Sequence, residues 1–341
     1  MHAQRWRTSL RGWGGVGAMA VVCALATLLV LLLPLTQTPA QRDGSTGIGG
    51  QGVAEGTQAR AEACEDNPQD LSLSPSLAEG PAIEAIKKRG HLSVGVDQNS
   101  YRWGYRDPNN TDTDVQLEGF DIDLARRIAQ ELLGDPDKIR FKAIPTNQRV
   151  PAIQSGQVDM VVRTMTITCS RLEQVDFSAP YFVTGQQVLA PKSSPIKGYD
   201  ESLADQRICS ADGSTAYEKL DADKKSGELP ASADISLTVP NQLDCLVRLQ
   251  LGEVDAVVTD GALAASQAAQ DPTVTLKGDT FTTEYYGVAM KKGADDLVRR
   301  VNRILEDYRK DGGWKRSYDN WLSATLGSNS DSATPPIPKY T

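Results

Sequence analysis

The fold is decided by a ten-residue stretch that the chain carries twice, as IQSGQVDMVV at residues 153–162 and LQLGEVDAVV at residues 249–258. Six of the ten positions are identical, and the copies lie 96 residues apart. Each copy has the pattern of a helix that ends at a glycine and is followed by a buried strand. Two copies of one such unit predict two lobes of similar topology.

The sequence around the first copy alternates strands and helices. Residues 92–96 and 141–144 predict two short strands. Between them, apolar residues recur at helical spacing from a capping Asp121 to a terminating Gly134. This order predicts an α/β fold, with a parallel sheet covered by helices, within residues 81–326.

Composition excludes several classes of function. The 341 residues carry a net charge of −8, which argues against nucleic-acid binding because phosphates need a basic face. Only two histidines occur, His2 and His91, which argues against Ser-His-Asp or Cys-His catalysis and against histidine-based zinc sites.

The N-terminal region predicts a membrane or signal segment. Residues 12–41 carry no charge, and the apolar core at 16–35 matches the thickness of a bilayer. Arginines precede it, so residues 1–15 are expected in the cytoplasm and the rest of the chain outside. An uncleaved anchor fits the length best; the alternatives are a signal cleaved after Ala40 and lipidation at Cys23.

Two further segments lack the pattern of a packed domain. Residues 36–80 are rich in Gly, Ser, Ala and Gln and predict a flexible tether. Residues 327–341 contain three prolines and predict a disordered tail.

Two motifs that could bind a cofactor or a metal lack the surrounding sequence that such binding needs. Residues 47–52 spell a dinucleotide-binding GxGxxG, but no strand enters it and no helix leaves it. The acidic stretch at 110–121 follows the spacing of a calcium loop, but Val115 occupies the position where that loop needs glycine. The sequence therefore predicts neither a cofactor nor a metal.

Polar residues follow the two repeated strands, and ligands of open α/β sheets bind beyond the carboxyl ends of the strands. The residues concerned are Arg163, Thr164, Thr166 and Arg171 after the first strand and Asp260 after the second. A guanidinium binds a carboxylate through two parallel hydrogen bonds, and a carboxylate binds an ammonium. An amino-acid zwitterion needs both partners, so these strand ends predict an amino-acid site.

A third segment, at residues 209–217, adds hydroxyl groups. It predicts a strand that ends in Gly213-Ser214-Thr215 and leads into a helix. Free N–H groups at a helix start, together with two hydroxyls, form an anion site. The alternative is that Ser214 caps the helix and does nothing more.

In combination, these motifs resemble the family 3 extracytoplasmic solute-binding proteins, which bind polar amino acids for ABC importers. The resemblance covers residues 81–322 and is greatest to glutamine- and glutamate-binding proteins of actinobacteria. Its motifs are GFDIDL at 119–124, SGQVD at 155–159, MTIT at 165–168, VDFSAPY at 175–181, GST at 213–215 and VDAVVTD at 254–260.

The resemblance implies a periplasmic-binding-protein-like fold of type II, with two α/β lobes joined by two hinge strands. Lobe one would comprise residues 81–183 and 286–326, and lobe two residues 184–285. The cleft between the lobes would hold the ligand.

By motif, Thr166 and Arg171 are expected to hold the α-carboxylate of the ligand, and Asp260 its α-ammonium group. Ser214 and Thr215 would assist from lobe two.

The segment from Asp97 to Trp103 commonly supplies ring contacts in this family, here from Tyr101 or Trp103. Arg163 and Thr164 depart from the family, since small residues are common at their positions.

The segment TNQRVPAI at 146–153 resembles the Asn-Arg-Ile-Pro segment of glutamate- and aspartate-binding proteins. Arg149 would then meet a side-chain carboxylate, with Arg163 or Arg102 as a second cation. This favours glutamate and aspartate over glutamine and asparagine, because a guanidinium cannot match the donors of an amide. The alternative is that Arg149 is a solvated helix residue.

The predicted function is therefore extracytoplasmic binding of a polar amino acid by lobe closure, without catalysis. The partner would be an ABC permease or a membrane sensor, and the N-terminal segment would hold the protein at the membrane. The alternative from another class is a lyase similar to cyclohexadienyl dehydratase on the same fold. It would need an acid–base group in the cleft, and the strand ends offer neither His nor a spare Glu.

Four cysteines outside the apolar segment allow three pairings, and thiols outside the membrane tend to oxidise. A bridge between lobes could lock the cleft, so pairing within lobes is favoured. That pairs Cys209 with Cys245 in lobe two. Cys64 is left for Cys169, unless Cys64 lies free in the tether.

Overall fold

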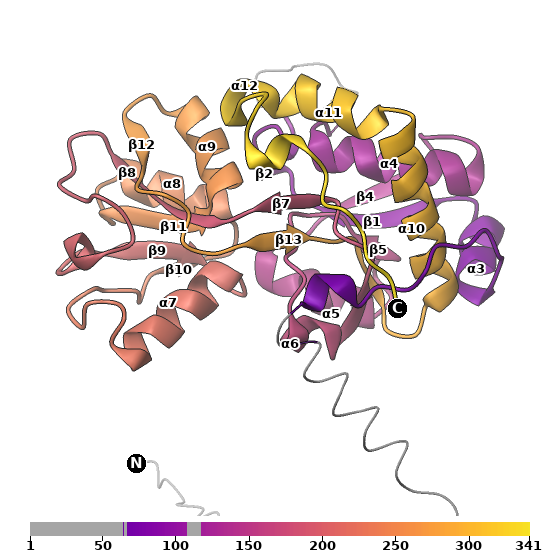
Figure 1. Ribbon diagram of the computed structural model, residues 1–341, viewed down its shortest axis with the longest axis horizontal. Coiled ribbons are helices and arrows are strands. Elements are labelled where there is room, and N and C mark those ends of the chain that lie inside the picture. The colour runs from indigo at the N-terminus through magenta and orange to yellow at the C-terminus, as the bar shows by residue number, and fades with distance from the viewer. Residues whose placement is uncertain (1–63, 65–66, 108–116) are drawn as a thin grey trace, which may run out of the picture. The chain divides into compact units, whose positions relative to one another are not determined.

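The computed structural model describes residue 64 and residues 67–107 and 117–341 (Figure 1). These described residues belong to one compact unit. The predicted cytoplasmic segment, the apolar segment and most of the tether lie outside the described residues, as does most of the acidic stretch at 110–121. Within the part of the chain that is described, no helix is long and apolar enough to cross a membrane.

Lobe one is built on a mixed sheet of five strands. The strands are β1 (Leu92–Val96), β4 (Ile139–Ala143), β5 (Met160–Val161), β6 (Val175–Phe177) and β14 (Ala289–Lys291). Their order is β4-β1-β5-β14-β6. Strand β1 runs parallel to β4 and β5, whereas β14 runs antiparallel to β5 and β6.

Helices accompany this sheet because parallel strands need crossover connections. They are α3 (Pro81–Arg89), α4 (Phe120–Leu133), α5 (Arg149–Gln154), α6 (Cys169–Leu172), α10 (Asp295–Lys310), α11 (Gly313–Trp321) and α12 (Ser323–Leu326). The shorter elements are η1 (Pro68–Asp70), η2 (Thr146–Gln148) and a hairpin of β2 (Asn99–Ser100) and β3 (Gly104–Tyr105).

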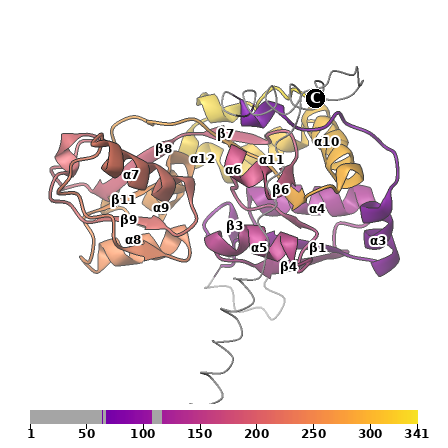
Figure 2. The same ribbon diagram turned by 90° about the horizontal axis from the view of Figure 1, so that it is seen from below.

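Lobe two repeats this arrangement. Its strands are β8 (Gln186–Pro191), β9 (Ile208–Ala211), β10 (Thr238–Val239), β11 (Ala256–Asp260) and β12 (Val274–Lys277), in the order β10-β9-β11-β8-β12. Strand β9 runs parallel to β10 and β11, and β8 runs antiparallel to β11 and β12. The helices are η3 (Glu201–Leu203), α7 (Thr215–Ser226), α8 (Gln242–Gln250) and α9 (Gly261–Gln270). Figure 2 shows the two sets of elements side by side.

The sequence repeat explains this likeness. In each copy a helix (α5 or α8) ends, a glycine follows, and a strand (β5 or β11) begins. Gly156 and Gly252 have φ of 71° and 70°, in the left-handed region that favours glycine. Strands β5 and β11 occupy the same third position in their sheets. The prediction of two α/β lobes of similar topology is confirmed.

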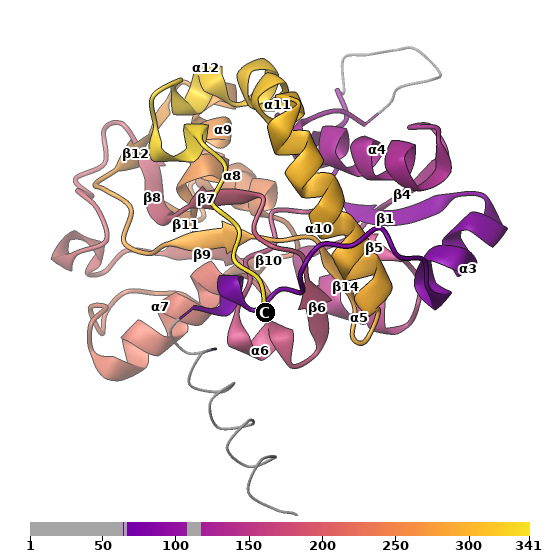
Figure 3. The same ribbon diagram turned by 45° about the vertical axis from the view of Figure 1, so that its right-hand side comes forward.

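Two antiparallel strands connect the lobes, β7 (Phe182–Thr184) and β13 (Glu284–Tyr286) (Figure 3). Aromatic rings fix them to the core of lobe one. Trp103 is fully buried and packs edge-on against Phe120, Phe182 and Tyr286. Such pairs contribute roughly 0.5–1.5 kcal/mol beyond their burial. The hinge therefore emerges from a rigid base, and Trp103 is a core residue.

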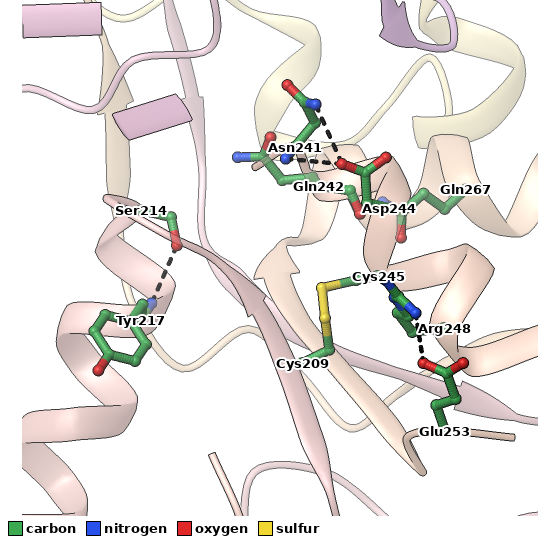
Figure 4. The surroundings of a disulfide bond; sticks show 10 residues. All are labelled: Cys209, Ser214, Tyr217, Asn241, Gln242, Asp244, Cys245, Arg248, Glu253 and Gln267. Atoms are coloured by element: carbon green, nitrogen blue, oxygen red, sulfur yellow. Dashed lines mark hydrogen bonds and ion pairs between the residues drawn. A yellow bond between two sulfur atoms is a disulfide. The ribbon is translucent and has the colours of Figure 1, made fainter. Parts of the chain in front are cut away.

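Both predicted disulfides are present, Cys64–Cys169 and Cys209–Cys245, each with 5.6 Å between the Cα atoms. Cys209 lies on β9 and Cys245 on α8, so the second bridge fastens a helix to the sheet of lobe two (Figure 4). Closing a loop of this length stabilises the folded state by roughly 3–4 kcal/mol in the chain-entropy account.

The C-terminal segment is ordered, which corrects the predicted disordered tail. It contains η4 (Asp331–Ala333), and Ser332 donates a hydrogen bond to the carbonyl of Val183 in the hinge strand β7 at 2.7 Å. The backbone of Thr341 donates to Ser72 at 2.9 Å. Residues 67–80, assigned to the tether, therefore pack with it on the folded unit. The prolines fix an extended backbone here instead of marking disorder.

Candidate functional site

A small polar cavity lies between the lobes. Seven predicted site residues line it: Arg149, Thr164, Thr166, Arg171, Ser214, Thr215 and Asp260. Ala216, Gln242 and Thr259 complete the lining. Its walls carry charge of both signs. Such walls suit a small polar molecule that itself carries both charges.

Asp260 supplies the negative charge of the cavity. It is the last residue of β11, where the carboxyl end of the strand faces the other lobe, and its side chain is buried. The hydroxyl of Tyr286, on the hinge strand β13, donates to its Oδ2. Burial, and next the nearby charge of Glu284, raise the pKa of Asp260 to about 7. A cation bound beside it would oppose that shift, because it favours the ionised carboxylate.

Arg171 is one of two guanidinium groups at the cavity. The short helix α6 presents it, and the side chain of Thr168 caps that helix by accepting from the Arg171 backbone. Arg171 Nη1 donates to the carbonyl of Thr166 at 2.7 Å, and Nη2 donates to the carbonyl of Gly213 in lobe two at 3.1 Å. Burial lowers its pKa from the ordinary value. An arginine nevertheless stays charged in a protein.

Arg149 is the second guanidinium, and it is 3% exposed. Four backbone carbonyls hold it: those of Thr146 at 2.9 Å, Gly213 at 3.1 Å, and Arg163 and Thr164 at 3.4 Å. Burial lowers the pKa of Arg149 well below its usual range, and the charges of Arg171 and Arg163 lower it further. The alternative of a solvated helix residue is thus wrong. The two guanidinium charges repel each other, and a bound anion would offset that repulsion.

Ser214 and Thr215 of lobe two both line the cavity, and Ser214 is also a helix cap. Ser214 caps α7 by accepting from the backbone N–H of Tyr217 at 3.1 Å (Figure 4), and it also lines the cavity. Thr215 Oγ1 donates to Glu284 Oε2 at 3.1 Å. The capping bond leaves the Ser214 hydroxyl hydrogen available to an anion.

A buried network holds Thr164 in place. Its φ of 38° is unusual for a β-branched residue. Its N–H donates to Asp121 Oδ2 at 2.9 Å, and the hydroxyl of Tyr181 donates to Asp121 Oδ1 at 2.8 Å. Burial raises the pKa of Asp121 to about 7. Asp121 therefore positions the loop after β5 and does not line the cavity.

Three predicted ligand residues lie elsewhere. Asp97 and Arg163 form a buried ion pair at 2.9 Å behind the cavity lining. Asp97 also accepts from Ser100 Oγ at 2.9 Å, which leaves it a structural role at the end of β1. Tyr101 packs edge-on against Tyr105 and lines a separate small pocket. Their positions do not support contact with the ligand.

The sequence interpretation missed Gln242. It begins α8 and lines the cavity from lobe two. The repeat could have revealed it, because Gln242 lies 96 residues after Thr146, which is the repeat spacing. These equivalent positions of the two lobes are in direct contact, because Thr146 Oγ1 donates to Gln242 Oε1 at 3.3 Å.

No group of His, Cys, Asp or Glu that could hold a metal ion occurs among the described residues. The cavity instead combines two guanidiniums, one carboxylate and several hydroxyls. That set can hold a zwitterion together with a second negative group.

Comparison with known proteins agrees with this geometry. The sequence matches the bacterial extracellular solute-binding proteins, family 3, over residues 92–324. The chain belongs to this family. It is 33% identical over 240 residues to the ABC transporter glutamine-binding protein GlnH of Bacillus subtilis (strain 168). The aligned residues make up 70% of this chain and 84% of GlnH.

Other members of the solute-binding family carry different names. The glutamate-binding protein GluB of Corynebacterium efficiens is 28% identical, covering 74% of this chain and 84% of GluB. A solved structure of an ancestral arginine-binding protein bound to glutamine superposes with a TM-score of 0.59 at 36% identity, covering 69% of this chain and 98% of the other. These relatives are binding proteins, so the prediction of a binding protein and not an enzyme is confirmed.

Proposed function

We propose that this solute-binding protein captures a polar amino acid between its lobes outside the cytoplasm and delivers it to an ABC importer, and that L-glutamate is the favoured ligand. The observation that carries the proposal is the presence of Arg149, Arg171 and Asp260 around one buried cavity. The names of the relatives support amino-acid capture for an ABC importer. Residues 16–35 would keep the protein at the membrane.

The α-carboxylate and α-ammonium of the ligand occupy opposite sides of the cavity. Arg171, with the hydroxyls of Thr166 and Ser214, holds the carboxylate, and Asp260 holds the ammonium. Arg171 comes from lobe one and Asp260 from lobe two, so the ligand contacts both lobes and stabilises their closed arrangement.

Arg149 supports an acidic ligand. The cavity lining carries two positive groups and one negative group, and an acidic amino acid carries two negative groups and one positive group. A side-chain carboxylate beside Arg149 would offset the repulsion between the Arg149 and Arg171 guanidiniums. The amide of glutamine would bring only a dipole, although glutamine-binding relatives show higher identity than GluB.

The test is the ratio of glutamate affinity to glutamine affinity, measured calorimetrically at pH 8. We expect the wild type to prefer glutamate by about 10- to 150-fold. This ratio corresponds to the contribution of about 1.5–3 kcal/mol that a hydrogen bond to a charged group makes. Arg149→Gln should bring that ratio close to one. A wild type that prefers glutamine, or a ratio that Arg149→Gln leaves unchanged, would contradict the assignment of glutamate.

A further inference from the structure

Gln242 approaches the cavity from the lobe opposite Arg149, and its backbone is held from three directions. Its carbonyl accepts from Gln267 Nε2 at 2.9 Å. Asn241 and Asp244 form a capping box around the start of α8. Cys245, one turn further, is bridged to Cys209 on β9 (Figure 4). Because β9 leads towards Ser214, the disulfide fastens the strand before Ser214 to the helix that begins at Gln242.

The amide of Gln242 is oriented by a chain of hydrogen bonds across the cleft. Arg163 Nη1 donates to Thr146 Oγ1 at 3.0 Å, and Thr146 Oγ1 donates to Gln242 Oε1 at 3.3 Å. A guanidinium can only donate, so Thr146 must accept from Arg163, and its single hydrogen is directed to Gln242. The reverse amide orientation would leave the buried Thr146 hydroxyl hydrogen without an acceptor, which is costly.

With the oxygen committed to Thr146, the two N–H groups of Gln242 face the cavity. Among the described residues the amide nitrogen has no hydrogen-bond partner. The buried ion pair with Asp97 holds the guanidinium of Arg163, which is the first donor of these hydrogen bonds, in place. The site therefore offers a fixed neutral donor at this point of its wall.

We propose that Gln242 is a specificity-determining residue whose amide N–H₂ binds an oxygen of the ligand side chain. This rests on the proposed amino-acid-binding function and adds the recognition of a side-chain acceptor from lobe two. The amide N–H₂ donates to a carboxylate or a carboxamide oxygen and disfavours cationic side chains, since an ammonium or guanidinium has only donors. Arg149 thus distinguishes ligand side chains by their charge, and Gln242 distinguishes side chains that accept hydrogen bonds from those that only donate them.

The experiment compares L-glutamate, L-glutamine and L-norvaline, which is an amino acid of similar length without a polar side chain. Affinities of the full-length protein are measured by calorimetry, with norvaline measured by displacement of glutamate. We expect Gln242→Leu to weaken glutamate and glutamine by about 10- to 100-fold and norvaline by less than threefold. Gln250→Leu is the matched control on the same helix, because Gln250 bonds Asp271 away from the cavity at 2.9 Å; it should change none of the three.

Two further variants keep the test decisive if Gln242→Leu fails to fold. Gln242→Glu replaces the donor with an acceptor and should weaken glutamate at least tenfold more than glutamine. Thr146→Val frees the amide to rotate and should reduce the preference for glutamate and glutamine over norvaline. Equal losses for all three ligands would overturn the role of Gln242 while leaving amino-acid binding intact. A wild type that binds none of them would overturn the proposed function itself.

Discussion

Replacing Arg171 with alanine should lower the affinity for the amino acid by more than a hundredfold. Arg171 is buried, and its guanidinium points between Thr166 of lobe one and Gly213 of lobe two. Without it, the ligand α-carboxylate enters a buried site and loses its charged partner. Breaking a buried ion pair costs about 3–5 kcal/mol, which is a few hundred-fold or more in affinity.

The measurement is calorimetric titration with glutamate, alongside circular dichroism to establish folding. Arg303→Ala is a matched control, because Arg303 lies on α10 and pairs with Asp307 on the half-exposed surface, away from the cavity. It should bind as the wild type does. A folded Arg171→Ala protein whose affinity stays within tenfold of the wild type would show that the carboxylate is held elsewhere.

Replacing Asp260 with asparagine should cause a loss of similar size, because Asp260 is the one carboxylate among the described residues that line the cavity. The asparagine keeps the shape of the side chain and can still accept from the Tyr286 hydroxyl. The loss therefore reports the missing charge opposite the ligand ammonium, about 3–5 kcal/mol.

The pH dependence distinguishes this role from a packing role. Burial is the main cause that raises the pKa of Asp260 to about 7. The ammonium binds the ionised form, so the affinity of the wild type should be constant above pH 7 and fall by about tenfold per unit below it. Between pH 5.5 and 8.5 both carboxylates of glutamate stay ionised. The Asp260→Asn protein should show no such fall; a wild-type affinity independent of pH would contradict the assignment.

Much of the fold could be predicted from local patterns. The repeated ten-residue stretch predicts a helix end, a glycine turn and a strand. The structure places both strands at equivalent positions in their sheets. The carboxyl ends of those strands supply Thr164, Thr166 and Asp260 to the cavity, as strand-end logic requires. The sequence therefore predicts these three lining residues without the structure.

The remaining features depend on tertiary contacts. Arg163 and Asp97 carry suitable chemistry for a ligand site, yet they neutralise each other in a buried pair, and no spacing in the sequence reveals that. Gln242 begins a helix and looks like an ordinary first-turn residue, so only its contact with Thr146 across the cleft exposes it. The order of the C-terminal segment has no local signal, because its hydrogen-bond partners lie far away in the sequence, at residues 70–72 and 183.

The most direct test of amino-acid capture is calorimetric titration of the protein with each of the twenty amino acids. We predict one site per chain, with glutamate binding most tightly, other acidic and amide amino acids more weakly, and cationic and apolar ones weakest. The bound amino acid should be recovered unchanged after long incubation. Heat from none of the twenty, tightest binding of an apolar or cationic amino acid, or conversion of the ligand would contradict the account.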